Sequence, residues 1–107
     1  MIIMDELINA LAETNYQFAH YAWSKAPDGD YGTYSEDSGA DLVADEQHIE
    51  RGTVVYINYF TRDDTGTPRT TIETALNSLN LPWYLNSVQY ENDTGYIHYE
   101  WSVGVFG

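Results

Sequence analysis

The stretch from residue 53 to residue 79 constrains the fold more than any other part of the sequence. Residues Thr53–Thr61 are nearly all β-branched or aromatic, the types that fit the pleated surface of a sheet. Alternation places Val55, Ile57 and Tyr59 on one face of the predicted strand. The other face then carries Val54, Tyr56, Asn58 and Phe60. Because both faces are largely apolar, we expect this strand at the centre of the sheet rather than at its edge.

A helix is predicted directly after this strand, beyond the polar turn at residues 62–68. Its apolar positions follow the i, i+3, i+4, i+7 spacing of a helix with one buried face, and they are Ile72, Ala75, Leu76 and Leu79. Thr67 with Pro68, or Thr70 with Glu73, provides a start signal, and Pro82 ends the helix. Because the helix folds back on the strand, we expect four residues to be buried together: Ile57, Ile72, Leu76 and Leu79.

The remaining segments predict a second helix and four further strands. The helix covers residues 2–13, and the strands are expected at residues 16–23, 31–35, 83–90 and 97–105. Residues 36–41 are predicted as an acidic loop, and residues 42–51 as one helical turn or irregular chain. Because so long a connection is uncommon in a compact domain, we expect residues 36–50 to be the most mobile part of the free protein and to become ordered against a neighbour.

This order of elements predicts one domain over residues 1–107. Most neighbouring strands are joined by short turns, which favours antiparallel pairing. We therefore predict an α+β fold, with an antiparallel or mixed sheet of four to five strands and two helices packed on one face.

The charge of the chain excludes several classes of partner. Lys and Arg number 4 and Asp and Glu number 17, which gives a formal net charge of −13. Direct binding to nucleic acid is excluded on this basis, because affinity for phosphate comes from Lys and Arg, and an anionic membrane surface is disfavoured for the same reason. The first residues lack the basic region of a signal peptide, so we expect the protein to be made in a cytoplasm and to have no membrane partner.

No motif frames a catalytic, cofactor or metal site. The chain has no Cys, and the three His residues lack the spacing of a zinc site. The calcium-loop, nucleophile-elbow and phosphate-loop patterns are absent, and no motif frames a pair of hydrolase carboxylates among the acidic residues. From the residues alone, a small enzyme is therefore the class with the least support, and we expect no cofactor.

Aromatic residues outnumber the positions that two short helices can cover. Ten Tyr and three Trp are many for 107 residues, and exposed aromatic residues favour protein interfaces. We expect contacts between subunits to include some of Tyr56, Phe60, Trp83 and Trp101. The predicted interface also includes three acidic residues of the long connection, Asp41, Asp45 and Glu46. Because crowded carboxylates repel one another without a counter-ion, a weak divalent-cation contact between subunits is a further alternative.

The order of landmarks along the chain is shared with a known family. After the N-terminal helix come an aromatic strand (Tyr16–Trp23), an aromatic segment with a proline (Pro27 to Tyr34) and an Ala-Asp pair (Ala44-Asp45-Glu46). They are followed by a strand that ends in Phe-Thr (Tyr56–Thr61), a helix of the form Ile-Glu-x-x-Leu (Ile72–Leu76) and an alternating aromatic strand at the end (Tyr96–Phe106). This order resembles the tail terminator, or tail completion, proteins of long-tailed bacteriophages and prophages over nearly the whole chain.

The resemblance implies a structural virion protein rather than an enzyme. It implies a homo-oligomeric ring, a hexamer in the relatives, that caps the tail tube, ends tail polymerisation and provides the surface that joins the head. The implied partners are further copies of this chain, the tail tube protein and the head–tail connector protein, and the implied location is the tail–neck region of the virion, after synthesis in the bacterial host cytoplasm. From the residues alone, the strong acidity also fits a different class, an acidic inhibitor that mimics DNA or neutralises a basic nuclease.

Overall fold

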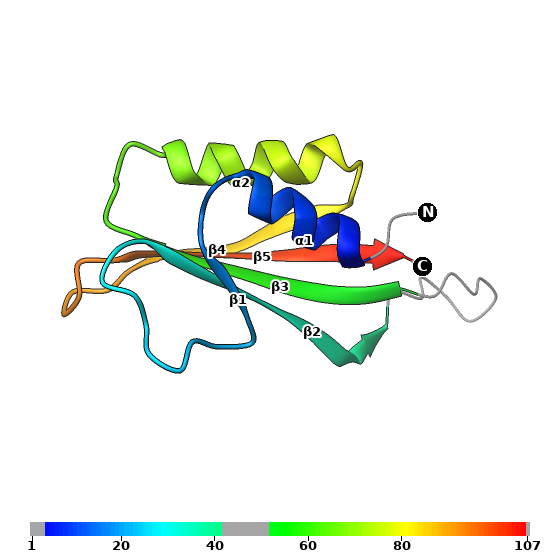
Figure 1. Cartoon of the computed structure of the whole chain (residues 1–107), viewed down its shortest axis with the longest axis horizontal. Coiled ribbons are helices and arrows are strands. Elements are labelled where there is room, and N and C mark those ends of the chain that lie inside the picture. Colours follow the sequence, from blue (N-terminus) through cyan, green and yellow to red (C-terminus); the bar gives the residue numbers. More distant parts are fainter. Residues whose placement is uncertain (1–3, 42–51, 107) are drawn as a thin grey trace.

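The computed structural model describes residues 4–41 and 52–106 of the chain. Two helices and five strands form in the order α1 (Met4–Glu13), β1 (Phe18–His20), β2 (Tyr31–Asp41), β3 (Gly52–Thr61), α2 (Thr67–Ser78), β4 (Trp83–Tyr90) and β5 (Ile97–Phe106) (Figure 1). The predicted order of elements is therefore confirmed.

The five strands form one mixed sheet with the order β1-β2-β3-β5-β4. Strands β1 and β2 are parallel, whereas the β2–β3, β3–β5 and β4–β5 pairs are antiparallel. This confirms the predicted α+β fold with a sheet of five strands. It also confirms that the strand beginning near Thr53 is central, because β3 lies between β2 and β5 and alternates between buried and half-buried residues.

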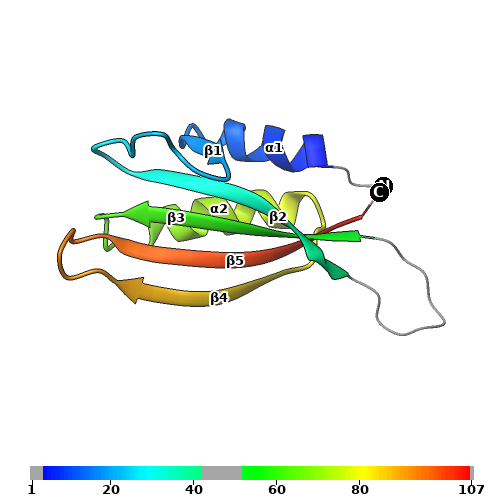
Figure 2. The same ribbon diagram turned by 90° about the horizontal axis from the view of Figure 1, so that it is seen from below.

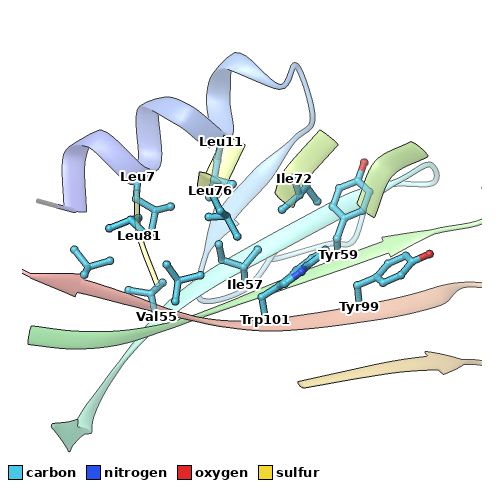
Figure 3. Packing of buried hydrophobic residues seen from close by; sticks show 12 residues of the cluster. Leu7, Leu11, Val55, Ile57, Tyr59, Ile72, Leu76, Leu81, Tyr99 and Trp101 are labelled. Atoms are coloured by element: carbon cyan, nitrogen blue, oxygen red, sulfur yellow. The ribbon is translucent and has the colours of Figure 1, made fainter. Parts of the chain in front are cut away.

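The core lies between the sheet and the helices. Figure 1 shows α1 and α2 on the same side of the sheet, and buried residues of both helices belong to one cluster with the odd-numbered residues of β3 and β5. Figure 3 shows Leu7 and Leu11 of α1 above Val55 and Ile57, with Ile72 and Leu76 of α2 beside them. Ile57, Ile72 and Leu76 are buried as predicted, while Leu79 is half-buried at the margin of the same cluster.

Two predicted strands have different lengths in the structure. Strand β1 is only Phe18–His20 rather than residues 16–23, and it ends where Tyr21 adopts a positive φ of 68° that interrupts the extended chain. The prediction of a loop at residues 36–41 is wrong, since these residues continue β2. Glu36 pairs with Val55, and the register then shifts before Asp41. The rest of the predicted mobile segment, residues 42–50, lies outside the described residues.

The start of α2 combines a glycine and a proline. Gly66 occupies the N-cap position with a positive φ of 85°, and Pro68 lies in the first turn, where its missing N–H leaves no helical hydrogen bond unmade. The Thr67–Pro68 start signal is therefore the one that the chain uses. Asp63 braces the preceding turn, because its Oδ1 accepts from both the backbone N–H and the hydroxyl of Thr65.

Candidate interaction surfaces

The four aromatic residues predicted at interfaces lie in three different environments. Tyr56 and Phe60 are half-buried on the face of the sheet opposite the helices, and Trp83 is half-buried at the start of β4. Trp101 is fully buried beneath the helices, so the prediction that it contributes to an interface is wrong. The reason is its register: it pairs with Ile57, and partners across a sheet share a face.

Of the three acidic residues predicted at the interface, only Asp41 lies within the described residues. Asp41 is the last residue of β2 and pairs with Thr53, whereas Asp45 and Glu46 lie outside the described residues. Over residues 4–41 and 52–106, no group of three or more His, Cys, Asp or Glu side chains is placed to hold a metal ion.

An aromatic row crosses the sheet on the face opposite the helices. Tyr31 of β2 stacks on Phe60 of β3 with ring centroids 4.8 Å apart, and Phe60 stacks on His98 of β5 at 4.2 Å. Tyr96 meets both Tyr31 and Phe60 edge to face. Burial, followed by the nearby Tyr96 and Glu91, raises the pKa of Tyr31. The rings therefore form a continuous set of contacts across three strands of this face.

Polar groups on the same face are paired with one another. His98 Nε2 lies 2.7 Å from Asn58 Oδ1, and the hydroxyl of Tyr56 donates to Asp37 Oδ2 at 3.0 Å. That hydrogen bond is the main cause of the raised pKa of Tyr56. Within the described part of the chain, no buried side-chain nitrogen or oxygen lacks a partner. This face therefore offers no unpaired buried group for a ligand to satisfy.

The segment between β1 and β2 is fastened to the same end of the sheet. The Tyr96 hydroxyl donates to the carbonyl of Gly29 at 2.8 Å, and the Arg62 guanidinium lies 4.0 Å from the centroid of the Tyr96 ring. Buried Thr61 donates to Asp30 Oδ2 at 2.7 Å. These contacts are cross-links between distant parts of the chain, so we assign Arg62 and Asp30 a structural role.

Strand β4 is a free edge of the sheet with apolar side chains in solvent. Among the described residues, four large apolar side chains are exposed, and three of them lie on β4: Tyr84 at 70%, Val88 at 49% and Tyr90 at 65%. The eight residues of β4 include no charged residue. Natural sheets commonly protect an exposed edge with charge, so an uncharged, apolar edge indicates a contact surface. A bulge at Asn86 divides this edge into two short stretches.

A groove lies at the opposite edge of the sheet, between α1 and β1. Its volume is about 410 Å³. Its apolar lining comes from Ile8, Leu11, Ala12 and Phe18, and the rest from Asn15, Tyr16, Gln17 and Tyr34. None of these side chains is charged. Neither the groove nor the β4 edge was predicted from the sequence, since each depends on which strands lie at the margins of the sheet.

The described histidines have ordinary structural partners. His20 on β1 stacks against Tyr21 and Tyr34, and its Nε2 lies 2.5 Å from Glu36 Oε1. His98 is held by Phe60 and Asn58. No helix in the described segments is long and apolar enough to cross a membrane.

Comparison with known proteins does not assign the chain to a family. No protein-family model matches the sequence, and no curated protein matches it. Solved structures include a match to a crystal structure from Akkermansia muciniphila, with 12% sequence identity and a TM-score of 0.48. That match covers 96% of this chain and 49% of the other, so this chain spans about half the length of its structural relative. The likeness is too distant to assign a function.

Proposed function

We propose that the protein is a structural component of a bacteriophage tail, which assembles into a ring, caps the tail tube, ends its polymerisation and provides the surface that joins the head. The observation that supports this most is the β4 edge, where exposed Tyr84, Val88 and Tyr90 meet solvent on a strand without charge. A surface of this kind favours association with another protein over small-molecule chemistry.

The distribution of charge supports a partner that is itself acidic. The chain carries a net charge of −13, yet β4 and the lining of the groove between α1 and β1 hold no charged side chain. Two copies of this chain therefore meet with the least repulsion if they use these surfaces. A ring of such acidic subunits suits a channel through which DNA passes without adhering.

The proposal includes the partners and location that the family resemblance implies. The partners are further copies of this chain, the tail tube protein and the head–tail connector protein, and the ring is placed in the tail–neck region after synthesis in the host cytoplasm. The role is structural, without catalysis or cofactor.

Two measurements test this function. Sedimentation velocity and negative-stain electron microscopy of the purified protein should show closed rings at high protein concentration. Deletion of the gene from the phage or prophage that encodes it should leave tails of uncontrolled length that do not join heads. Tails of normal length after deletion would contradict the proposal. A tight one-to-one complex of the monomer with a basic nuclease would instead favour the acidic inhibitor.

A further inference from the structure

We propose that copies of this chain associate head to tail, with Val88 and Tyr90 on β4 of one copy seated in the groove between α1 and β1 of the next copy. The inference rests on the proposed function only in assuming that copies associate. It adds which surfaces meet and therefore what symmetry the assembly has.

The two surfaces lie at opposite edges of one sheet. Strand β1 is at one end of the strand order and β4 at the other, and Figure 2 shows α1 and β1 along one margin with β4 along the opposite margin. Such an arrangement lets one copy offer β4 while its own groove remains free for a third copy. A contact between two different surfaces is heterologous, and it repeats until the rotation closes a ring.

The strand registers place the two surfaces at the same level and on the same face. Phe18, in the groove lining, pairs with Gly32, which pairs with Tyr59. Tyr59 pairs with Tyr99, and Tyr99 pairs with Val88. Partners across a sheet share a face, so this row runs from the groove to β4 on the helix side throughout. A second copy placed edge to edge without a shift along the strands therefore brings its Val88 level with the Phe18 of its neighbour.

The chemistry of the groove suits the side chains that β4 offers. Ile8, Leu11 and Phe18 provide apolar walls for an aliphatic side chain and an aromatic ring. Asn15 and Gln17, both exposed at the rim, provide partners for the hydroxyl of an entering tyrosine. A tyrosine has an apolar ring and a polar tip, and it binds best where both are matched. The groove therefore fits Tyr90 better than it fits a charged segment.

The absence of charge on both surfaces fits a second copy of this acidic chain as the occupant. A partner with a net charge of −13 is repelled by acidic surfaces, and the chain is acidic elsewhere. The eight residues of β4 and the eight that line the groove are uncharged, so no like charges meet among these side chains themselves. A basic partner would gain nothing from these two surfaces and would bind the acidic remainder instead.

Cross-linking with single cysteines tests the arrangement directly, because the chain has no cysteine of its own. Ala12→Cys marks the groove and Val88→Cys marks β4, and both positions are exposed. A mixture of the two variants, treated with a short bismaleimide, should give a cross-linked dimer that neither variant gives alone. Thr74→Cys, on the exposed side of α2, is the control and should cross-link with neither. A dimer formed by Val88→Cys alone would overturn the head-to-tail arrangement in favour of a symmetric edge contact.

A second experiment separates this inference from the proposed function. Val88→Lys places a charge in the contact, whereas Thr74→Lys makes the same change in net charge away from it. The first should weaken self-association in sedimentation by about tenfold or more, because a charge is buried without a partner. The second should leave association unchanged or strengthen it slightly, since it lowers the repulsion. Equal behaviour of the two variants in an assembling protein would overturn the inference and leave ring formation standing. A wild-type protein that stays monomeric at every salt and protein concentration would overturn the inference, and the deletion phenotype would then decide the proposed function.

Discussion

The indole Nε1 of Trp101 donates a hydrogen bond to Glu73 Oε2 at 3.0 Å, which joins the buried face of β5 to α2. The same carboxylate oxygen accepts from Arg69 Nε one helical turn earlier. Trp101 is fully buried, so its N–H has no access to water. Glu73 therefore has a structural role, because it accepts the hydrogen bond of the one polar atom in the largest core side chain.

Replacing Glu73 tests this contact. Glu73→Ala leaves the buried indole N–H without an acceptor and should lower the free energy of unfolding by about 1–3 kcal/mol. Glu73→Gln retains a side-chain oxygen and should lower it by clearly less. The measurement is urea denaturation followed by tryptophan fluorescence. Arg69→Ala is the control for the exposed ion pair and should cost no more than about 0.5 kcal/mol. If Arg69→Ala and Glu73→Gln each lowered the free energy of unfolding by about 1–3 kcal/mol, the stabilisation would come from the charge of Glu73 rather than from its hydrogen bond to Trp101.

The sequence predicts the elements of this fold because its apolar periods are unambiguous there. Val55, Ile57 and Tyr59 alternate on β3, Ile72 and Leu76 recur at helical spacing, and both sets are buried. The C-terminal half of β2 could not be predicted in the same way. Residues 36–41 are mostly acidic or small, and the chain there is extended because β3 offers it a partner. Pairing with a distant strand overrides local propensity.

The contact surfaces were less predictable for a related reason. Alternation shows that Trp101 and Ile97 share a face of their strand, but only the register with Ile57 shows that the helices cover that face. Likewise, the composition of residues 83–90 indicates a strand without indicating an edge. Because strand order depends on long-range pairing, the free edge at β4 and the groove at β1 emerge only in three dimensions.

Gly32 is required by close packing against Phe18. A Cβ at position 32 would lie 2.4 Å from Phe18 Cε1 and 2.8 Å from the carbonyl oxygen of Asn58. Gly32→Ala should therefore destabilise the protein by about 1–3 kcal/mol through overpacking. Gly29→Ala is the matched control, because a Cβ at position 29 meets nothing within 4 Å. The thermal midpoint of the Gly29→Ala variant should match that of the wild type. Unchanged stability of Gly32→Ala would show that Phe18 does not pack against this position.

The two leucines at the end of α2 should differ in their contribution to stability. Leu76 is fully buried in the core, whereas Leu79 is half-buried at its margin. Leu76→Ala should cost about 2–5 kcal/mol because it leaves a cavity that the sheet cannot fill. Leu79→Ala should cost less, since water fills the space that it leaves. Denaturant titration of both variants checks the order, and a loss below about 0.5 kcal/mol for Leu76→Ala would contradict the packing of α2.

The turn before α2 should titrate at low pH. Hydrogen bonds from the hydroxyl and then the backbone N–H of Thr65 hold the pKa of Asp63 below its ordinary value of 3.8. Because this pKa is lower in the folded state than in the unfolded state, Asp63 stabilises the fold at pH values above the unfolded-state pKa. This stabilisation is lost as the pH falls through the folded-state pKa. Thr65→Val removes the hydroxyl donor and should raise the pKa of Asp63 towards 3.8, as measured by carboxyl NMR titration. An unchanged pKa would show that the hydroxyl does not hold the carboxylate.

Self-association should strengthen as salt is added. Each copy carries −13, so close approach is opposed by repulsion that acts beyond the contact itself. Between about 0.01 M and about 1 M salt the Debye length falls from about 30 Å to about 3 Å, which removes most of that repulsion. Burial of Val88 and Tyr90 then contributes about 25 cal/mol for each Å² of apolar surface removed from water, and salt does not screen this term.

Sedimentation velocity across a salt series measures this balance. The fraction of assembled protein should rise with NaCl, whereas an acidic inhibitor bound to a basic target should dissociate over the same range. MgCl₂ at matched ionic strength distinguishes screening from a specific cation contact. Equal assembly in the two salts would indicate screening alone, whereas stronger assembly in MgCl₂ would indicate a specific cation contact. Assembly that weakens with NaCl would show that attraction between opposite charges, rather than the uncharged β4 edge, holds the copies together.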